Sequence, residues 1–130
     1  ETLYIDYNAS DTNEIDVTQI LFYDERNNQF RAEDRNNDGV AELKITSGML
    51  SGNYTAELVS LMDKTDLNNE SIYYKSGTLS GDTKSSTHSI NLGSLNFSVN
   101  NTSNVDSSGP VLNSISSSES INSYFSNFAN

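Results

Sequence analysis

Short segments in which apolar and polar residues alternate are the feature that most constrains the fold of this chain. Leu3, Ile5 and Tyr7 are apolar at every second position, and the segment Leu95–Val99 repeats the spacing. A period of two places apolar side chains on one face of a β-strand, and Gly, Asn, Asp and Ser residues separate the segments. This rhythm predicts an all-β, antiparallel sandwich. Strands are predicted at Thr2–Tyr7, Val17–Tyr23, Gln29–Glu33, Val40–Thr46, Tyr54–Met62, Ser71–Tyr74, His88–Leu92 and Leu95–Val99.

The predicted core consists of the apolar residues that share one face of these strands. One apolar and one polar face are typical of antiparallel sheets. Between Gly77 and Ser89 the chain is rich in Ser, Thr, Gly and Asp, which predicts a loop. The core residues are predicted to be Leu3, Ile5, Ile20, Phe22, Phe30, Leu43, Ile45, Tyr54, Ala56, Leu58, Ile90, Leu95, Phe97 and Val99.

The length of 130 residues is sufficient for one hydrophobic core but not for two. We predict a β-sandwich domain over residues 1–106 and a terminal segment over residues 107–130. Within that segment, Val111–Ile115 is interpreted as a strand that either completes this sandwich or begins a following module. Apolar residues spaced as on one helix face suggest a short terminal helix, with an edge strand or a mobile tail as alternatives. These residues are Ile121, Tyr124, Phe125 and Phe128.

The charge balance excludes one large class of partner. The formal net charge is -11, and the seven Lys and Arg residues are scattered. Such a surface repels phosphate backbones, so we predict no nucleic-acid partner and expect cations to bind. No apolar run approaches the roughly 20 residues of a membrane span, so no membrane insertion is predicted. No signal peptide opens the chain, so we interpret the protein as either cytosolic or a module of a longer exported protein.

One acidic segment, Asp34–Glu42, has the spacing of a calcium loop. Calcium is bound by six to eight oxygen ligands, and a glycine at loop position 6 lets the backbone turn so that these oxygens converge. Gly39 occupies that position here. The predicted ligands are the side chains of Asp34, Asn36 and Asp38, the backbone carbonyl of Val40 and the carboxylate of Glu42.

The flanks of this loop predict a β-hairpin rather than an EF-hand. Residues alternate between apolar and polar on both sides, and loop position 12 is Ile45 instead of the glutamate that an EF-hand requires. In this respect the segment resembles the hairpin calcium loops of integrin-type propeller blades, with Glu42 where those loops usually carry Asp. The alternative interpretation is that Asn37-Asp38-Gly39 is simply a tight turn.

The sequence gives little support for catalysis. His88 is the sole histidine, so a Ser-His-Asp arrangement would depend on it alone. A zinc site with nitrogen and sulfur ligands is equally disfavoured, because the chain has no cysteine. Carboxylate pairs such as Asp24-Glu25 are common by chance in so acidic a chain, and nothing places two of them across a cleft. We therefore predict that the protein is not an enzyme.

Three segments resemble the immunoglobulin-like repeat modules of large exported bacterial proteins. Glu1–Asp11 followed by Ile15–Ile20 is similar to the opening of such a module, and Leu50–Asp63 is similar to its later pair of strands. Ser108–Ile115 is similar to a module start, although it comes last here. The resemblance implies an immunoglobulin-like β-sandwich of about seven to nine strands. It also implies secretion or display on the bacterial cell surface, with neighbouring modules in the same chain.

These observations predict a calcium-stabilised extracellular module with a structural or adhesive role. The alternative is a carbohydrate-binding β-sandwich module appended to a secreted hydrolase, in which aromatic rings stack on a glycan or another surface ligand. Four tyrosines are available for that role. They are Tyr4, Tyr23, Tyr73 and Tyr74, of which the last two are strand neighbours that should point to opposite faces.

Overall fold

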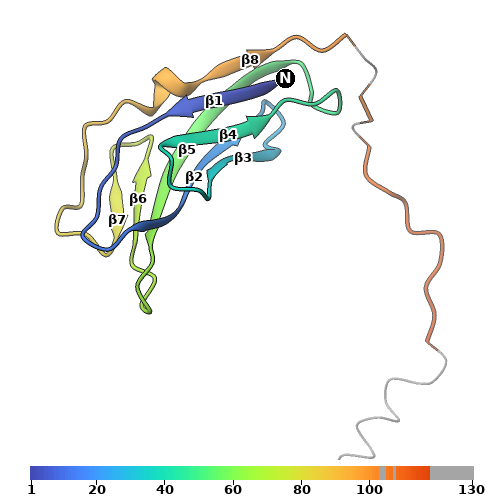
Figure 1. The fold of residues 1–130 in the computed structure, drawn as a ribbon. Coiled ribbons are helices and arrows are strands. Elements are labelled where there is room, and N and C mark those ends of the chain that lie inside the picture. Colours follow the sequence, from blue (N-terminus) through green and yellow to red (C-terminus); the bar gives the residue numbers. More distant parts are fainter. Residues whose placement is uncertain (103–104, 107, 118–130) are drawn as a thin grey trace, which may run out of the picture.

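The described part of the chain contains eight β-strands, and the predicted all-β fold is confirmed (Figure 1). The computed structural model describes residues 1–102, 105–106 and 108–117. Every strand pair is antiparallel. The elements are β1 (Thr2–Asp6), β2 (Ile15–Tyr23), β3 (Gln29–Asp34), β4 (Val40–Lys44), β5 (Gly52–Asp63), β6 (Glu70–Tyr74), β7 (Leu79–Gly81), the 3-10 helix η1 (Leu92–Leu95) and β8 (Phe97–Val99).

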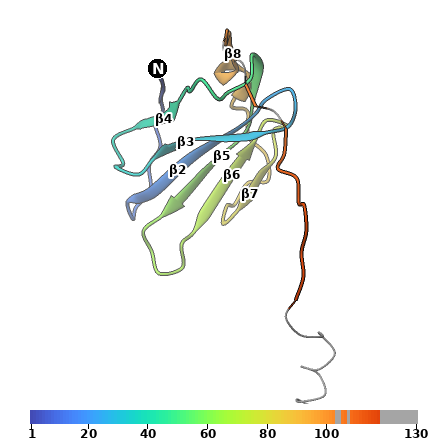
Figure 2. The same ribbon diagram turned by 90° about the vertical axis from the view of Figure 1, so that its right-hand side faces the viewer.

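The strands form one strongly twisted sheet in the order β1-β4-β3-β2-β5-β6-β7 (Figure 2). The long strand β5 changes partner along its length. Its first residues, Gly52–Tyr54, pair with β8, and its last residues, Leu58–Met62, pair with β6. Because β8 pairs only with the beginning of β5, it lies outside the main path of the sheet. The fold is therefore sandwich-like, with β8 and η1 packed against the inner face of the sheet.

The core lies on this inner face, where alternate residues of each strand converge. Two irregularities in the pairing of β2 with β5 change which residues face inward, one of them between Leu21 and Phe22. Both of these residues are buried as a result. The buried cluster consists of Ile5, Ile20, Phe22, Ala32, Ala41, Leu43, Ala56 and Leu92.

Aromatic packing attaches β8 to the sheet. The Phe97 ring stacks on Tyr54 with centroids 4.9 Å apart, and its edge contacts Phe22 at 5.1 Å. Just before β8, the side-chain oxygen of Asn96 accepts a hydrogen bond of 2.9 Å from the Ala56 N–H group. Ala56 lies between the part of β5 that pairs with β8 and the part that pairs with β6. The bond to Asn96 therefore gives the Ala56 N–H group an acceptor where β5 changes its partner strand.

Seven of the eight predicted strands overlap observed strands, but His88–Leu92 does not form one. The His88 ring accepts a hydrogen bond from the Ile90 N–H group, and Asn91 caps η1, so local side-chain bonds replace a ladder. Ile90 is 63% exposed, and its predicted place in the core is wrong. Leu92 is buried instead. The predicted loop over residues 77–89 contains the short strand β7, because backbone pairing with β6 forms a ladder without any apolar pattern.

Beyond β8 the described part of the chain forms no further strand. Val111–Ile115 is extended and exposed, so within the described residues it completes no ladder of its own domain. The segment Ile121–Phe128, for which the sequence leaves a short helix, an edge strand or a mobile tail open, lies outside the described residues. Within the described residues, no helix has the length and hydropathy required to cross a bilayer.

Replacing Phe97 by alanine should destabilise the fold strongly, because it removes the ring that joins β8 to the sheet. We expect a loss of about 3 kcal/mol in the free energy of unfolding, near the lower end for a large aromatic residue because Phe97 is only half-buried. Urea unfolding followed by circular dichroism measures it. Ile90→Ala is the control and should change stability by less than about 0.5 kcal/mol. Equal losses in both variants would contradict the packing described here.

Candidate cation site and aspartate-closed turns

The loop between β3 and β4 is folded around the carboxylate of Asp34. Its Oδ1 accepts the Asn36 N–H group at 3.0 Å, and its Oδ2 accepts the Gly39 N–H group at 3.0 Å. Two residues of the loop, Asn37 and Gly39, have φ of 54° and 80°, in the left-handed region where asparagine and glycine are tolerated best. A Cβ at Gly39 would also lie 3.3 Å from the Tyr7 carbonyl. The sequence therefore places its most permissive residues where the turn is tightest.

Tyr7 joins this loop to the segment that follows β1. Its hydroxyl donates a short hydrogen bond to Asp34 Oδ2, and its N–H group donates to the Gly39 carbonyl at 3.0 Å. Burial raises the pKa of Asp34, but the hydrogen bonds from Tyr7, Asn36 and Gly39 outweigh it and hold the pKa below its ordinary value of 3.8. Burial and the nearby carboxylate raise the pKa of Tyr7, with a smaller opposing contribution from the Thr18 hydroxyl.

The structure separates the predicted calcium ligands into two groups. Asp34 is buried on the inner face, and Asn36 and Asp38 follow it in the exposed turn. Glu42 is exposed on β4 and stands directly opposite Glu33. Since adjacent strand residues point to opposite faces, this register turns Glu42 to the face away from Asp34.

Val40, whose carbonyl was a predicted ligand, is the first residue of β4, and its N–H group donates to Asp38 Oδ1 at 3.1 Å. The described residues contain no group of three or more His, Cys, Asp or Glu side chains arranged to hold a metal. The other three predicted side-chain ligands, Asp34, Asn36 and Asp38, lie in one turn, where Asp34 is buried and Asn36 and Asp38 are exposed.

Two further hairpins are closed in the same way, which the sequence analysis did not recognise. At the end of β2, Asp24 accepts the N–H groups of Arg26 at 2.9 Å and Asn28 at 2.8 Å, and its Oδ2 accepts the Asn28 side-chain amide at 2.8 Å. Burial raises the pKa of Asp24, but these bonds outweigh it, so the pKa lies below 3.8. The sequence signal is an aspartate at the strand end followed a few residues later by an asparagine that donates back to it.

Asp63 closes the third turn, between β5 and β6. The Thr65 hydroxyl donates to it at 2.7 Å, and the Asn69 N–H group donates at 3.0 Å. The Thr65 hydroxyl lowers the pKa of Asp63 most; burial opposes it, and further bonds from Thr65 and Asn69 add to the lowering. All three aspartates are at most 7% exposed. Their negative charges are therefore stabilised by hydrogen bonds rather than by contact with water.

The sole histidine, His88, contacts backbone groups through both ring nitrogens. His88 Nε2 lies 2.7 Å from the Tyr74 carbonyl, its Nδ1 accepts the Ile90 N–H group at 3.0 Å, and its ring edge contacts Tyr73. Because Nδ1 is an acceptor, the neutral ring carries its proton on Nε2. Both ring nitrogens are thus engaged with backbone groups, and the ring joins the loop after β7 to β6.

Comparison with known proteins gives no relative from which a function can be transferred. The chain matches no protein-family model, and no curated protein or solved structure is significantly similar to it. The resemblance to immunoglobulin-like modules therefore stays a prediction.

Acidification should remove the stability that the three aspartates supply. Their pKa values are lower in the folded than in the unfolded chain, so this stability is present above the ordinary value of 3.8 and is lost as the pH falls through the lower folded values. We expect Asp24→Asn to cost about 1–2 kcal/mol at neutral pH, because a neutral acceptor forms weaker bonds. Urea unfolding as a function of pH measures the gap to the unmutated protein.

That gap should close as the pH falls below the lowered folded-state pKa of Asp24, because a protonated aspartic acid resembles asparagine. Acidification also reduces the charge repulsion within the molecule. This effect is shared by the unmutated protein and Asp24→Asn, so it cancels in the difference between their free energies of unfolding. Asp66→Asn, which removes an exposed carboxylate from the β5–β6 turn, is the control and should leave stability nearly unchanged. A gap that stays constant from neutral to acidic pH would show that the Asp24 charge does not hold its turn.

Proposed function

We propose that this protein is a structural or adhesive module of an exported bacterial protein, stiffened by calcium at the β3–β4 turn. The observation that carries the proposal is the folding of this turn around Asp34, with Asn36 and Asp38 exposed beside it. The resemblance of the chain to modules of large exported proteins supplies the expected setting. Calcium is abundant outside cells, where modules bind it with modest affinity.

The side-chain oxygens of this turn are chemically suited to bind calcium. Asp34 Oδ2 accepts the Tyr7 hydroxyl and the Gly39 N–H group, so we assign the cation to Oδ1, which accepts the Asn36 N–H group. Asp38 uses Oδ1 for the Val40 N–H group, which leaves Oδ2 for an ion. Calcium prefers such hard oxygen ligands and accepts water in the remaining positions. In this arrangement water takes the place predicted for Glu42.

The net charge of -11 adds a second reason to expect cation binding. Like charges on a folded surface repel each other and destabilise the compact state. The turn concentrates Asp34 and Asp38 within five residues, next to Glu33. Arg35 neutralises Glu33 through an ion pair of 2.8 Å, but that pair is exposed and contributes little to stability. A divalent ion at the turn would offset the remaining repulsion.

Adding calcium should raise the melting temperature of the protein by several degrees. An ion that binds only the folded state stabilises by about 1.4–2.7 kcal/mol at ten to a hundred times its dissociation constant. Differential scanning calorimetry with millimolar calcium, against chelator alone, measures the shift. Asp38→Ala should abolish it, because this substitution removes an exposed ligand.

Glu42→Gln is the matched control and should retain the shift, since Glu42 lies on the opposite face of the sheet from Asp34. Asp34→Ala is unsuitable on its own, because it also leaves Tyr7 and Gly39 without their acceptor. No shift in the unmutated protein would refute the calcium proposal. A shift that disappears in Glu42→Gln but persists in Asp38→Ala would refute the placement of the site.

One observation favours the carbohydrate-binding alternative. Tyr4 is 62% exposed on β1, whereas Tyr23, Tyr73 and Tyr74 are half-buried. A single exposed ring is a smaller platform than stacking on sugar faces normally uses, so this function is our second candidate.

A glycan array separates the two candidates. If the module binds sugars through Tyr4, reproducible hits should be weakened at least about tenfold by Tyr4→Ala, as expected when an aromatic contact is lost. Tyr73→Ala is not a suitable comparison, because its ring packs on His88. Tyr4→Phe is the matched control and should retain binding. A silent array would leave the structural role as the remaining proposal.

A further inference from the structure

The two ends of the sheet differ in how their edges are covered. At β7 the edge is covered by the following loop: Thr78 bridges to Thr87, and the Leu79 N–H group donates to the Ser86 carbonyl at 2.9 Å. At the other end, β1 pairs only with β4, and β8 pairs only with β5, among the described strands. Both β1 and β8 therefore present an unpaired edge. An open edge is a template for a further strand.

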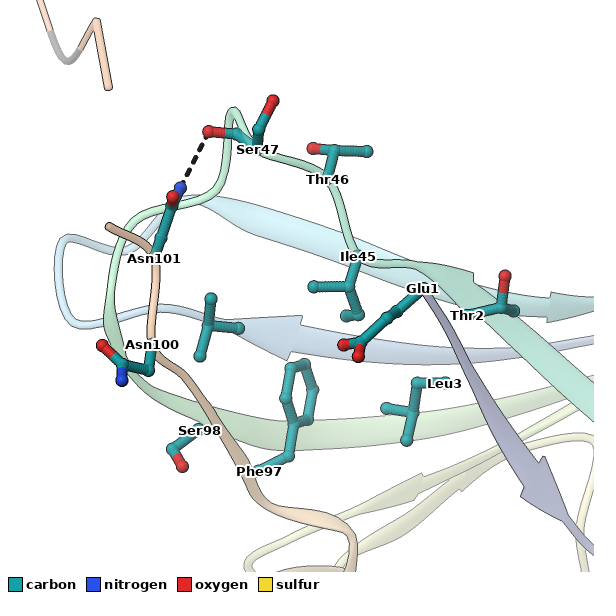
Figure 3. A pocket seen from close by; sticks show the side chains of 11 residues that line it. Glu1, Thr2, Leu3, Ile45, Thr46, Ser47, Phe97, Ser98, Asn100 and Asn101 are labelled. Carbon is teal, nitrogen blue, oxygen red and sulfur yellow. Dashed lines mark hydrogen bonds between the residues drawn. The ribbon is translucent and has the colours of Figure 1, made fainter. Parts of the chain in front are cut away.

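These two edges border a groove of about 560 Å³. Thr2 and Leu3 line one side, and Phe97–Asn101 lines the other (Figure 3). The side chains of Leu3, Ile45 and Phe97 point toward one another and give the groove an apolar floor (Figure 3). Glu1, which is exposed, also lines the groove, and its side chain points toward Ile45 and Phe97 (Figure 3). The wall formed by Phe97–Asn101 is five residues long, about the 17 Å of a five-residue strand.

The hydrogen bonds of β1 leave donors available to such a strand. The Glu1 carbonyl accepts the Ile45 N–H group at 2.9 Å, so the odd-numbered residues of β1 face β4. In an antiparallel ladder the N–H groups of successive residues point to opposite sides. Those of Thr2 and Tyr4 therefore point away from β4, toward the open edge.

The same chain carries an apolar segment that covers nothing in its own domain. Val111, Leu112 and Ile115 are 79%, 75% and 84% exposed. They make up half of the six large hydrophobic residues that are exposed in the described part of the chain, within five positions. Val111 and Ile115 share one face of an extended strand. Such a concentration of exposed apolar side chains marks a contact surface.

The course of the chain directs this segment away from its own groove. Asn101 is fixed to the β4–β5 loop by side-chain bonds of 2.8 Å to the Ser47 carbonyl and 2.6 Å to the Met49 carbonyl. Further along the chain, Val105, Asp106, Ser108 and Gly109 border a second cavity together with Asp24, Arg26 and Asn28 of the β2–β3 turn. Residues 110–117 then run away from the strands and do not lie along β1 or β8 (Figures 1 and 2).

We propose that residues 111–115 of a second copy of this chain occupy the groove as a strand between β1 and β8. The incoming strand pairs its backbone with the open edges and places Val111 and Ile115 on the apolar floor. Each copy has one segment and one groove, so reciprocal exchange gives a two-fold dimer, and one-way exchange gives a chain of copies. The contact requires no metal, so it stands independently of the calcium proposal.

Sedimentation velocity of the full chain over a wide concentration range tests this proposal. We expect reversible association that Val111→Asp/Ile115→Asp weakens by about 100-fold or more, because two apolar contacts are replaced by charges. Leu67→Asp is the control, since Leu67 is 82% exposed but lies in the β5–β6 turn. Thr2→Pro should also weaken association, because it removes an outward N–H group while leaving the β4 ladder intact.

Hydrogen exchange at the Thr2 and Tyr4 amides identifies the occupant. Slow exchange in the associated protein, and fast exchange in the double aspartate variant, are the expected results. A monomer with slow exchange at these amides would show that the segment folds back into its own groove, which overturns the second copy as the occupant. A monomer with fast exchange would show an empty groove. Association that the double variant leaves unchanged would place the contact elsewhere, and both results would also overturn the proposal.

Discussion

Buried aspartates at the ends of strands hold the turns on which the rest of the sheet depends. Burying a carboxylate costs several kcal/mol unless hydrogen bonds replace its water. Asp24, Asp34 and Asp63 each accept at least three such bonds from within or beside their turns. The backbone N–H groups of these turns obtain acceptors at the same time. Each carboxylate therefore fixes the length and shape of a hairpin connection, and neither side of the bond is satisfied without the other.

Fixed turns set the register of the strands, and register decides which side chains meet. In the β3–β4 hairpin, Glu33 pairs with Glu42, so Asp34 lies on the same face as Ala41, where both are buried. A slip of one residue would exchange these faces and place Glu42 in the core. The hydrogen bonds of Asp34 thus fix the register on which the core depends. A cation can bind only to oxygens of the turn that these hydrogen bonds leave accessible.

Much of the fold could be predicted from the sequence, because alternation is the direct signature of a strand with one buried face. Prediction from alternation failed where backbone hydrogen bonds, and not burial, define the structure. Strand β7 is an example, because its pairing with β6 needs no apolar residue. The prediction also failed at Ile90. The alternating pattern continues there in the sequence, but the Ile90 N–H group donates to the His88 ring instead of to a neighbouring strand. The packing of Leu92 under the sheet depends on η1, a turn with no periodic signal.

The sequence indicates which residues form the β3–β4 turn, but not the directions in which their side chains point. Counting loop positions treats Asp34 and Glu42 as equivalent ligands, whereas the pleat of β4 sends Glu42 to the opposite face. The same rule, applied to the sequence with the observed register, would have removed Glu42 from the set. Asp24 and Asp63 were missed for a different reason, since their partners are mainly backbone groups and nearby asparagines that are frequent throughout this chain.

The charge of the molecule links the two proposals. Two copies of a chain with net charge -11 repel each other, and exchange of an apolar strand has to overcome that repulsion. The repulsion between exposed charges is screened within about 10 Å in moderate salt, while apolar contact in the groove is not weakened by it. Glu1, which lines the groove, adds a local charge that an incoming strand must displace. Cations that neutralise the acidic surface therefore favour the association of copies even when they bind far from the groove.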